Sequence, residues 1–111
     1  MVQEFDKETQ EKIQELQGME QTFQSMLMQK QAFHMELSET ENALAEITNS
    51  NEDVFKLVGN IMIKSKKEDI EKELKKKQEL LSLRLKSIES QESEFTKRSE
   101  ELREEVMKKI K

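Results

Sequence analysis

The feature that most constrains this chain is a short run, residues 54–65, where β-branched and aromatic residues crowd together without a helical period. Gly59 and Asn60 separate two apolar segments within this run. Glycine at the first central position of a two-residue hairpin turn accepts a positive φ because it has no Cβ to clash. We therefore predict two antiparallel strands joined by a tight turn, with Val58 opposite Ile61.

This register places apolar side chains on both faces of the hairpin, since side chains alternate along a strand. One face carries Val54, Lys56, Val58, Ile61, Ile63 and Ser65, and the other carries Phe55, Leu57, Met62 and Lys64. A lone two-stranded hairpin is marginally stable in water and has two unpaired edges, so strands from other chains should complete it. The residues expected to form this oligomer contact are Val54, Phe55, Leu57, Val58, Gly59, Ile61, Met62 and Ile63.

The sequence on either side of the hairpin is typical of long helices. The chain of 111 residues is 33% hydrophobic and 39% charged, contains no proline, and has only two glycines. Disorder is the competing interpretation of so polar a composition, but the regular spacing of the apolar residues argues against it. The predicted fold is therefore mainly α, with two helices joined by a single β-hairpin over residues 53–65.

The helix boundaries follow from capping residues. The first helix is expected over about residues 6–49, with Asp6 as the N-cap and with an asparagine near position 49 closing it in a left-handed conformation. The second is expected over residues 66–111, where Ser65 and Glu68 match a capping box.

Both helices carry a coiled-coil seam, a stripe of residues spaced alternately three and four apart. The first seam is Leu16, Met19, Phe23, Met26, Lys30, Phe33, Leu37, Thr40, Leu44 and Ile47; the second includes Leu74, Leu81, Leu85, Ile88, Phe95, Leu102 and Val106. If the hairpin folds the helices back antiparallel, five seam pairs share an index sum of 118. They are Leu16 with Leu102, Phe23 with Phe95, Lys30 with Ile88, Leu37 with Leu81, and Leu44 with Leu74.

Polar residues interrupt the seam toward the free ends of the helices. On the same sum, Met19 faces Ser99 and Met26 faces Glu92. We expect Lys30 and Glu92 to extend their charges to solvent, because an unpaired buried charge is costly. The coiled coil should accordingly be tight near the hairpin and looser at the free ends.

Charge and residue content exclude several classes of function. Residues 1–52 carry three lysines against eleven acids, net −8, whereas residues 53–111 carry sixteen bases against thirteen acids, net +3, so the two helices should attract each other. The basic run from Lys75 to Lys77 fits this pairing better than nucleic-acid binding. His34 is the only histidine and cysteine is absent, so we expect no metal site, no cofactor and no catalytic group. No membrane span or signal peptide is recognisable, and a cytoplasmic location is expected.

The free ends hold more apolar residues than one seam can bury. These candidates for binding another protein are Phe5, Ile13, Leu16, Met19, Leu102, Val106, Met107 and Ile110. Exposed apolar surface usually marks an interaction site. One hypothesis is a structural coiled-coil adaptor whose free ends bind one defined partner.

The order helix, single hairpin, helix, with residues 54–64 at the hairpin and Lys67-Glu68 opening the second helix, resembles the beta-type subunits of the prefoldin family, especially the archaeal form. The resemblance covers nearly the whole chain and implies one domain over residues 1–111. It also implies a hetero-hexamer of two alpha-type and four beta-type subunits, with the hairpins in a double β-barrel platform. The coiled-coil tips would then hold unfolded proteins and pass them to a group II chaperonin without ATP.

Overall fold

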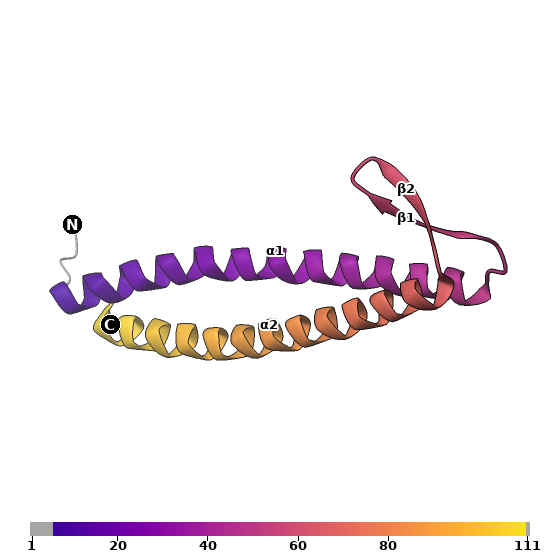
Figure 1. Cartoon of the computed structure of the whole chain (residues 1–111). Helices are drawn as coiled ribbons and strands as arrows, with labels where there is room; N and C mark the ends of the chain where they lie inside the picture. The colour runs from indigo at the N-terminus through magenta and orange to yellow at the C-terminus, as the bar shows by residue number, and fades with distance from the viewer. Residues whose placement is uncertain (1–5, 111) are drawn as a thin grey trace. The chain divides into compact units, whose positions relative to one another are not determined.

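The computed structural model describes residues 6–110 and contains two helices and one hairpin (Figure 1). The elements are α1 (Lys7–Asn49), β1 (Val54–Val58), β2 (Ile61–Ser65) and α2 (Lys67–Ile110). The predicted fold, mainly α with two helices joined by one hairpin, is confirmed. Neither described helix has a stretch long and apolar enough to cross a membrane.

The chain divides into two compact units. The terminal unit comprises Met1–Lys30 and Ser87–Lys111, and the hairpin unit comprises Gln31–Lys86. Each unit contains a segment of both helices, and the hairpin unit also contains β1 and β2.

The start of α1 is capped as predicted. The Asp6 Oδ1 atom accepts a hydrogen bond from the Thr9 backbone N–H at 2.7 Å, and the Asp6 carbonyl accepts one from Gln10 N–H at 3.0 Å. The side-chain bond satisfies one of the backbone N–H groups that an α-helix leaves unpaired at its first turn, and the Gln10 bond is the first regular bond of the helix.

The end of α1 differs from the prediction. The helix stops at Asn49, but no described residue other than glycine has a positive φ, so the left-handed asparagine is wrong. Instead, the Lys67 ammonium group donates to the carbonyl oxygens of Thr48 and Ser50, at 3.3 and 2.9 Å. The last turn of α1 has no basic side chain of its own, and Lys67 supplies the cation that its carbonyls favour.

The predicted capping box of α2 is also wrong. Ser65 belongs to β2, where it pairs with Val54, and its hydroxyl donates to the Ile63 carbonyl at 3.3 Å. The helix begins one residue later than expected, and the Lys66 carbonyl accepts its first-turn bond from Ile70 N–H at 3.1 Å. Lys66 therefore occupies the N-cap position in place of Ser65, whose hydroxyl bonds within the hairpin.

The hairpin has the predicted register, with Val58 paired to Ile61 and Leu57 to Met62. Gly59 has a φ of 60°, and it is the one described residue with a positive φ. A positive φ at the first of two central residues is the geometry of a type II′ turn, which suits the right-handed twist of the paired strands. Any residue with a Cβ would be strained at this position.

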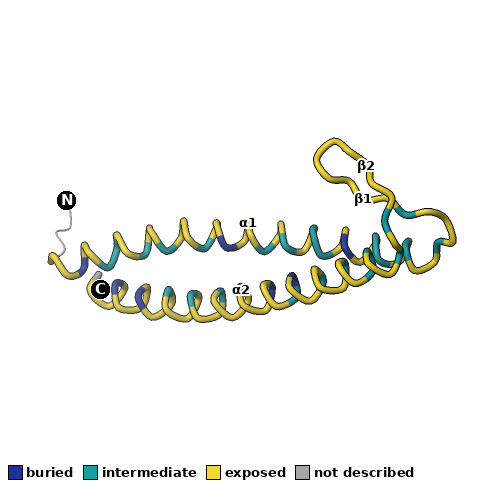
Figure 2. The backbone as a smooth tube through the Cα atoms, viewed as in Figure 1, coloured by how far each residue is buried: buried dark blue, intermediate teal, exposed yellow. Residues whose placement is uncertain are grey.

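The predicted seam is confirmed by burial, because every seam residue named above is buried or half-buried. Buried and half-buried positions recur along both helices in Figure 2. The antiparallel register is supported directly in the terminal unit, where the Phe23 and Phe95 rings stack with centroids 6.4 Å apart. In the hairpin unit, the Arg84 guanidinium lies 6.0 Å from the Phe33 ring centroid, within range of a cation–π interaction.

The expectation of a looser coiled coil at the free ends is wrong for the last turns. Leu102 and Val106 in the terminal unit are only 1% and 7% exposed, comparable to Leu81 at 2% in the hairpin unit. Thr9, seven residues before Leu16, is 1% exposed and extends the first seam by one heptad. No apolar signal in the sequence marks Thr9 as a seam residue, because its side chain carries a hydroxyl.

The sequence predicts that Lys30 and Glu92 extend their charges separately to solvent, and this prediction is wrong. The Lys30 Nζ and Glu92 Oε2 atoms lie 3.4 Å apart, and the side chains are 27% and 23% exposed. They occupy adjacent layers of opposite seams, so each charge is neutralised by the other at the edge of the core. A half-buried ion pair thus replaces two separate solvated charges.

Candidate functional site

The first candidate surface is the hairpin surface, made of the exposed apolar side chains of β1 and β2. Its members are Phe55, Leu57, Val58, Ile61, Met62 and Ile63, each between 49% and 67% exposed. Val54 is half-buried. The described residues form a sheet of only these two strands, so both outer edges have unpaired backbone groups.

The hairpin surface could contribute strongly to association. Fully burying one large apolar side chain is worth about 1.5 to 3 kcal/mol, and about half of each of the six side chains is still exposed. Covering them would contribute roughly 5 to 9 kcal/mol per chain, before the entropic cost of association. The hairpin surface therefore favours association with other strands.

Few polar contacts tie the hairpin to the rest of the hairpin unit. Lys56 Nζ lies 3.0 Å from Glu73 Oε1 on α2, and Lys64 Nζ lies 3.5 Å from Asp53 Oδ2 in the connection to β1. All four side chains are largely exposed, so each pair contributes little stability. The hairpin surface therefore remains open for other chains.

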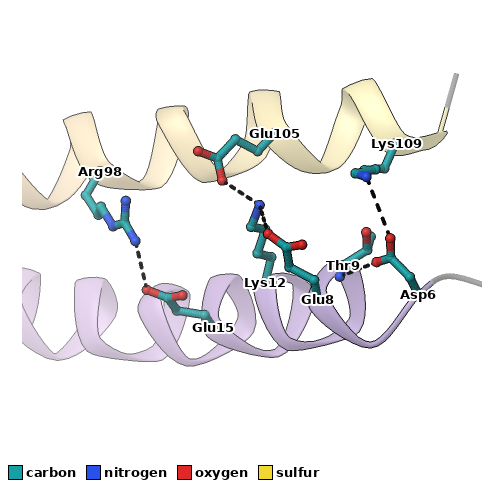
Figure 3. Close-up of polar contacts among 8 residues, drawn as sticks. All are labelled: Asp6, Glu8, Thr9, Lys12, Glu15, Arg98, Glu105 and Lys109. Atoms are coloured by element: carbon teal, nitrogen blue, oxygen red, sulfur yellow. Dashed lines mark hydrogen bonds and ion pairs between the residues drawn. The ribbon is translucent and has the colours of Figure 1, made fainter.

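The second candidate surface lies in the terminal unit, where ion pairs bridge the two helices (Figure 3). Lys12 lies between Glu105 of α2 at 3.0 Å and Glu8 of its own helix at 3.3 Å. Glu15 pairs with Arg98 at 3.6 Å, and Asp6 pairs with Lys109 at the same distance. The latter two pairs join acids of the acidic first part of the chain to bases of α2, as the charge asymmetry predicts.

These contacts shift three pKa values. Hydrogen bonds from the Thr9 side chain and then its backbone N–H lower the pKa of Asp6. The hydrogen bond from Lys12 lowers the pKa of Glu105, and the hydrogen bonds to Glu105 and Glu8 raise the pKa of Lys12. All three shifts favour the charged forms; those of Lys12 and Glu105 stabilise the contact between the helices, and that of Asp6 mainly stabilises the start of α1.

A pH dependence follows from these directions. A lowered carboxyl pKa stabilises the fold above the ordinary value, about 4, and this stabilisation is lost as pH falls through the lowered value. The raised pKa of Lys12 acts oppositely: its contribution is present below about 10.4 and is lost as pH rises through the raised value. At pH 7, the double variant Asp6→Asn/Glu105→Gln should melt a few degrees below the unmodified chain.

That difference should vanish at pH 2, where both carboxyls are protonated in either state. Circular dichroism melts at the two pH values measure it. Glu101→Gln is the control, because Glu101 is exposed and forms no ion pair among the described residues. An equal difference at pH 7 and pH 2 would show that the carboxylate charges do not stabilise the terminal unit.

The structure separates the residues predicted to bind another protein. Leu102 and Val106 are buried in the seam, whereas Met107 is 48% exposed. Three more, Ile13, Leu16 and Met19, are half-buried. Phe5 and the side chain of Ile110 lie outside the described residues.

The half-buried residues line a groove between α1 and α2 in the terminal unit. Its volume is about 430 Å³, and the lining residues are Ile13, Leu16, Gln17, Met19, Glu20, Phe23, Phe95, Thr96, Ser99, Glu100 and Arg103. We call it the Ser99 groove. The sequence marked the Met19–Ser99 layer as polar, but it did not indicate which side of the helix pair would open.

Comparison with known proteins identifies related chains. The family described as prefoldin subunit matches residues 10–111. A protein named prefoldin subunit beta from Archaeoglobus fulgidus is 33% identical over 93% of this chain and 90% of its own length. One of the same name from Methanosarcina acetivorans is 35% identical over 99% and 96%. The crystal structure of the prefoldin beta subunit from Thermococcus strain KS-1 is similar with a TM-score of 0.85, 31% identity, and 96% of both chains covered.

Proposed function

Because this chain belongs to the prefoldin subunit family, a family of chaperone subunits rather than enzymes, we propose that it is a beta-type subunit of an ATP-independent holdase. A holdase binds unfolded proteins, its clients, and prevents their aggregation. The single observation that carries the proposal is the hairpin surface, six exposed apolar side chains on a two-stranded sheet with open edges.

In this proposal the hairpin surface joins the chain to other prefoldin subunits. Four beta-type and two alpha-type subunits would contribute their strands to a double β-barrel platform, which would pair the open edges and cover the apolar faces. Such closure accounts for a sheet with two apolar faces, because one buried face alone would leave the other in water.

The terminal unit would supply the client contacts. Four beta-type subunits would present four copies of each apolar site, and weak contacts made together give far higher avidity than one contact alone. Delivery to a group II chaperonin completes the proposal and is supported by family membership. The second candidate, an adaptor for one defined partner, would use the same free ends.

The proposal is tested by asking whether the complex protects several unrelated proteins or only one. The chain is assembled with its alpha-type partner and added, without nucleotide, to several unrelated proteins diluted from denaturant while light scattering is followed. A holdase should suppress the scattering of all of them at near-stoichiometric concentration, and the alpha-type subunit alone serves as the control. Protection of none of the clients would contradict the chaperone function and favour the adaptor.

A further inference from the structure

The Ser99 groove exists because a small residue occupies a seam position. Ser99 faces Met19 across the seam, whereas most other seam positions hold Leu, Ile or Phe. The stacked rings of Phe23 and Phe95 occupy the next layer on one side, and the buried Leu102 lies in the next layer on the other. Serine lacks the volume to fill the space between these layers, and a groove remains.

The groove offers apolar surface that the coiled coil itself does not need. Ile13, Leu16 and Met19 line it and are half-buried, so each retains exposed apolar area. Leu102 and Val106, which could have bound a client, are nearly fully buried. A volume of about 430 Å³ lies within the range of about 300 to 1,000 Å³ that is usual for ligand pockets.

The rim of the groove has uncompensated negative charge. Glu20, Glu100 and Arg103 line it, are exposed, and form no ion pair among the described residues. Nearby charges are paired, including Glu15 with Arg98 and Lys12 with Glu105. Two acids against one base give the rim a net charge of −1, which complements a cationic ligand.

We propose that the Ser99 groove is a client subsite that accepts one large apolar side chain of an extended segment with a Lys or Arg close beside it. The inference rests on the proposed holdase function and specifies the kind of segment that is held. The apolar side chain occupies the space at the Ser99 layer, and the basic neighbour lies over the acidic rim. Segments with this pattern occur in most unfolded proteins, and one such contact is weak enough to release.

A second hollow continues the surface along α2. It is about 420 Å³ in volume and is lined by Glu100, Arg103, Glu104, Met107 and Lys108. Glu100 and Arg103 line both hollows, so the two adjoin. An extended segment that fills the groove therefore runs along α2 toward the exposed Met107.

The test fills the groove and leaves the rest of the chain intact. In the assembled complex, Ser99→Leu should retain full assembly and an equal or higher melting temperature, because leucine completes the seam layer. It should also raise the concentration needed for half-maximal client protection about tenfold or more. Ser93→Leu is the matched control, since Ser93 is an exposed serine of α2 in the same unit and does not line the groove. Protection is thus lost without a loss of stability only if the groove binds clients.

Protection by Ser99→Leu equal to that of the unmodified complex would overturn the groove as a client site. The unmodified complex would still protect in that case, so failure of the groove is distinguishable from failure of the holdase function. If Ser99→Leu melts at a lower temperature, a variant with reversed charges at the rim tests whether the groove binds clients.

Glu20→Lys/Glu100→Lys changes only exposed positions. Binding is measured by fluorescence anisotropy at low salt with two labelled peptides, in which one leucine is flanked by lysines or by glutamates. The unmodified complex should prefer the lysine peptide, and the variant should prefer the glutamate peptide. Glu94→Lys/Glu101→Lys, with the same change in net charge, should keep the original preference. Equal binding of both peptides to the unmodified complex would overturn the proposed basic flank.

Discussion

Replacing Val58 and Ile61 by lysine should release free monomers that keep the helical circular dichroism of the unmodified chain. The two residues are a cross-strand pair and are 51% and 66% exposed, so they are available to a partner chain. Their loss removes roughly 2 to 3 kcal/mol of apolar burial per chain, which weakens association about 30- to 150-fold. The two lysines would also be like charges directly opposite each other.

Co-expression with the alpha-type partner, followed by size-exclusion chromatography with light scattering, measures this loss of assembly. Leu80→Lys/Leu83→Lys is a closely matched control, because these leucines of α2 are 48% and 64% exposed but lie outside the hairpin. The control should assemble normally. A hexamer formed by the Val58→Lys/Ile61→Lys variant would show that the hairpin surface is not the assembly contact.

Removing residues 1–23 together with 95–111 should leave assembly intact and abolish client protection. The index sum of 118 makes these lengths match, so the cut falls at the Phe23–Phe95 layer on both helices and leaves neither one unpaired. The truncation removes the Ser99 groove and the exposed Met107, and it retains the hairpin surface. Light scattering of the complex and of aggregating clients measures the two properties separately.

A second variant separates apolar surface from charge in this experiment. Asp6→Asn/Glu105→Gln removes two acidic partners of the ion pairs but keeps every apolar side chain of the terminal unit. It should still protect clients. A truncated complex that protects as well as the full chain would place the client contacts in the hairpin unit or in the partner subunits.

Local patterns predicted most of the fold and one of its two surfaces. The Gly59-Asn60 turn, the pairing of Val58 with Ile61 and the exposed apolar faces of the hairpin all follow from the two-residue period of a strand. The two seams and their antiparallel register follow from the heptad period, and the stack of Phe23 on Phe95 confirms that register. These features depend on residues that are close in sequence or related by one simple repeat.

Other features depended on which side chains meet across the two helices. Lys67 caps the end of α1 from the start of α2, Lys30 pairs with Glu92, and the seam buries Leu102 more fully than Leu16 or Met19 of the same apolar cluster. The sequence marked Ser99 as a weak point in the seam, but only the packing of the layers on either side turned that position into a groove. The sequence by itself determined the helices, the hairpin and their register, because periodicity is a property of the chain. The tertiary structure decided the caps, the ion pairs and the groove, because these depend on distances between atoms that no local pattern specifies.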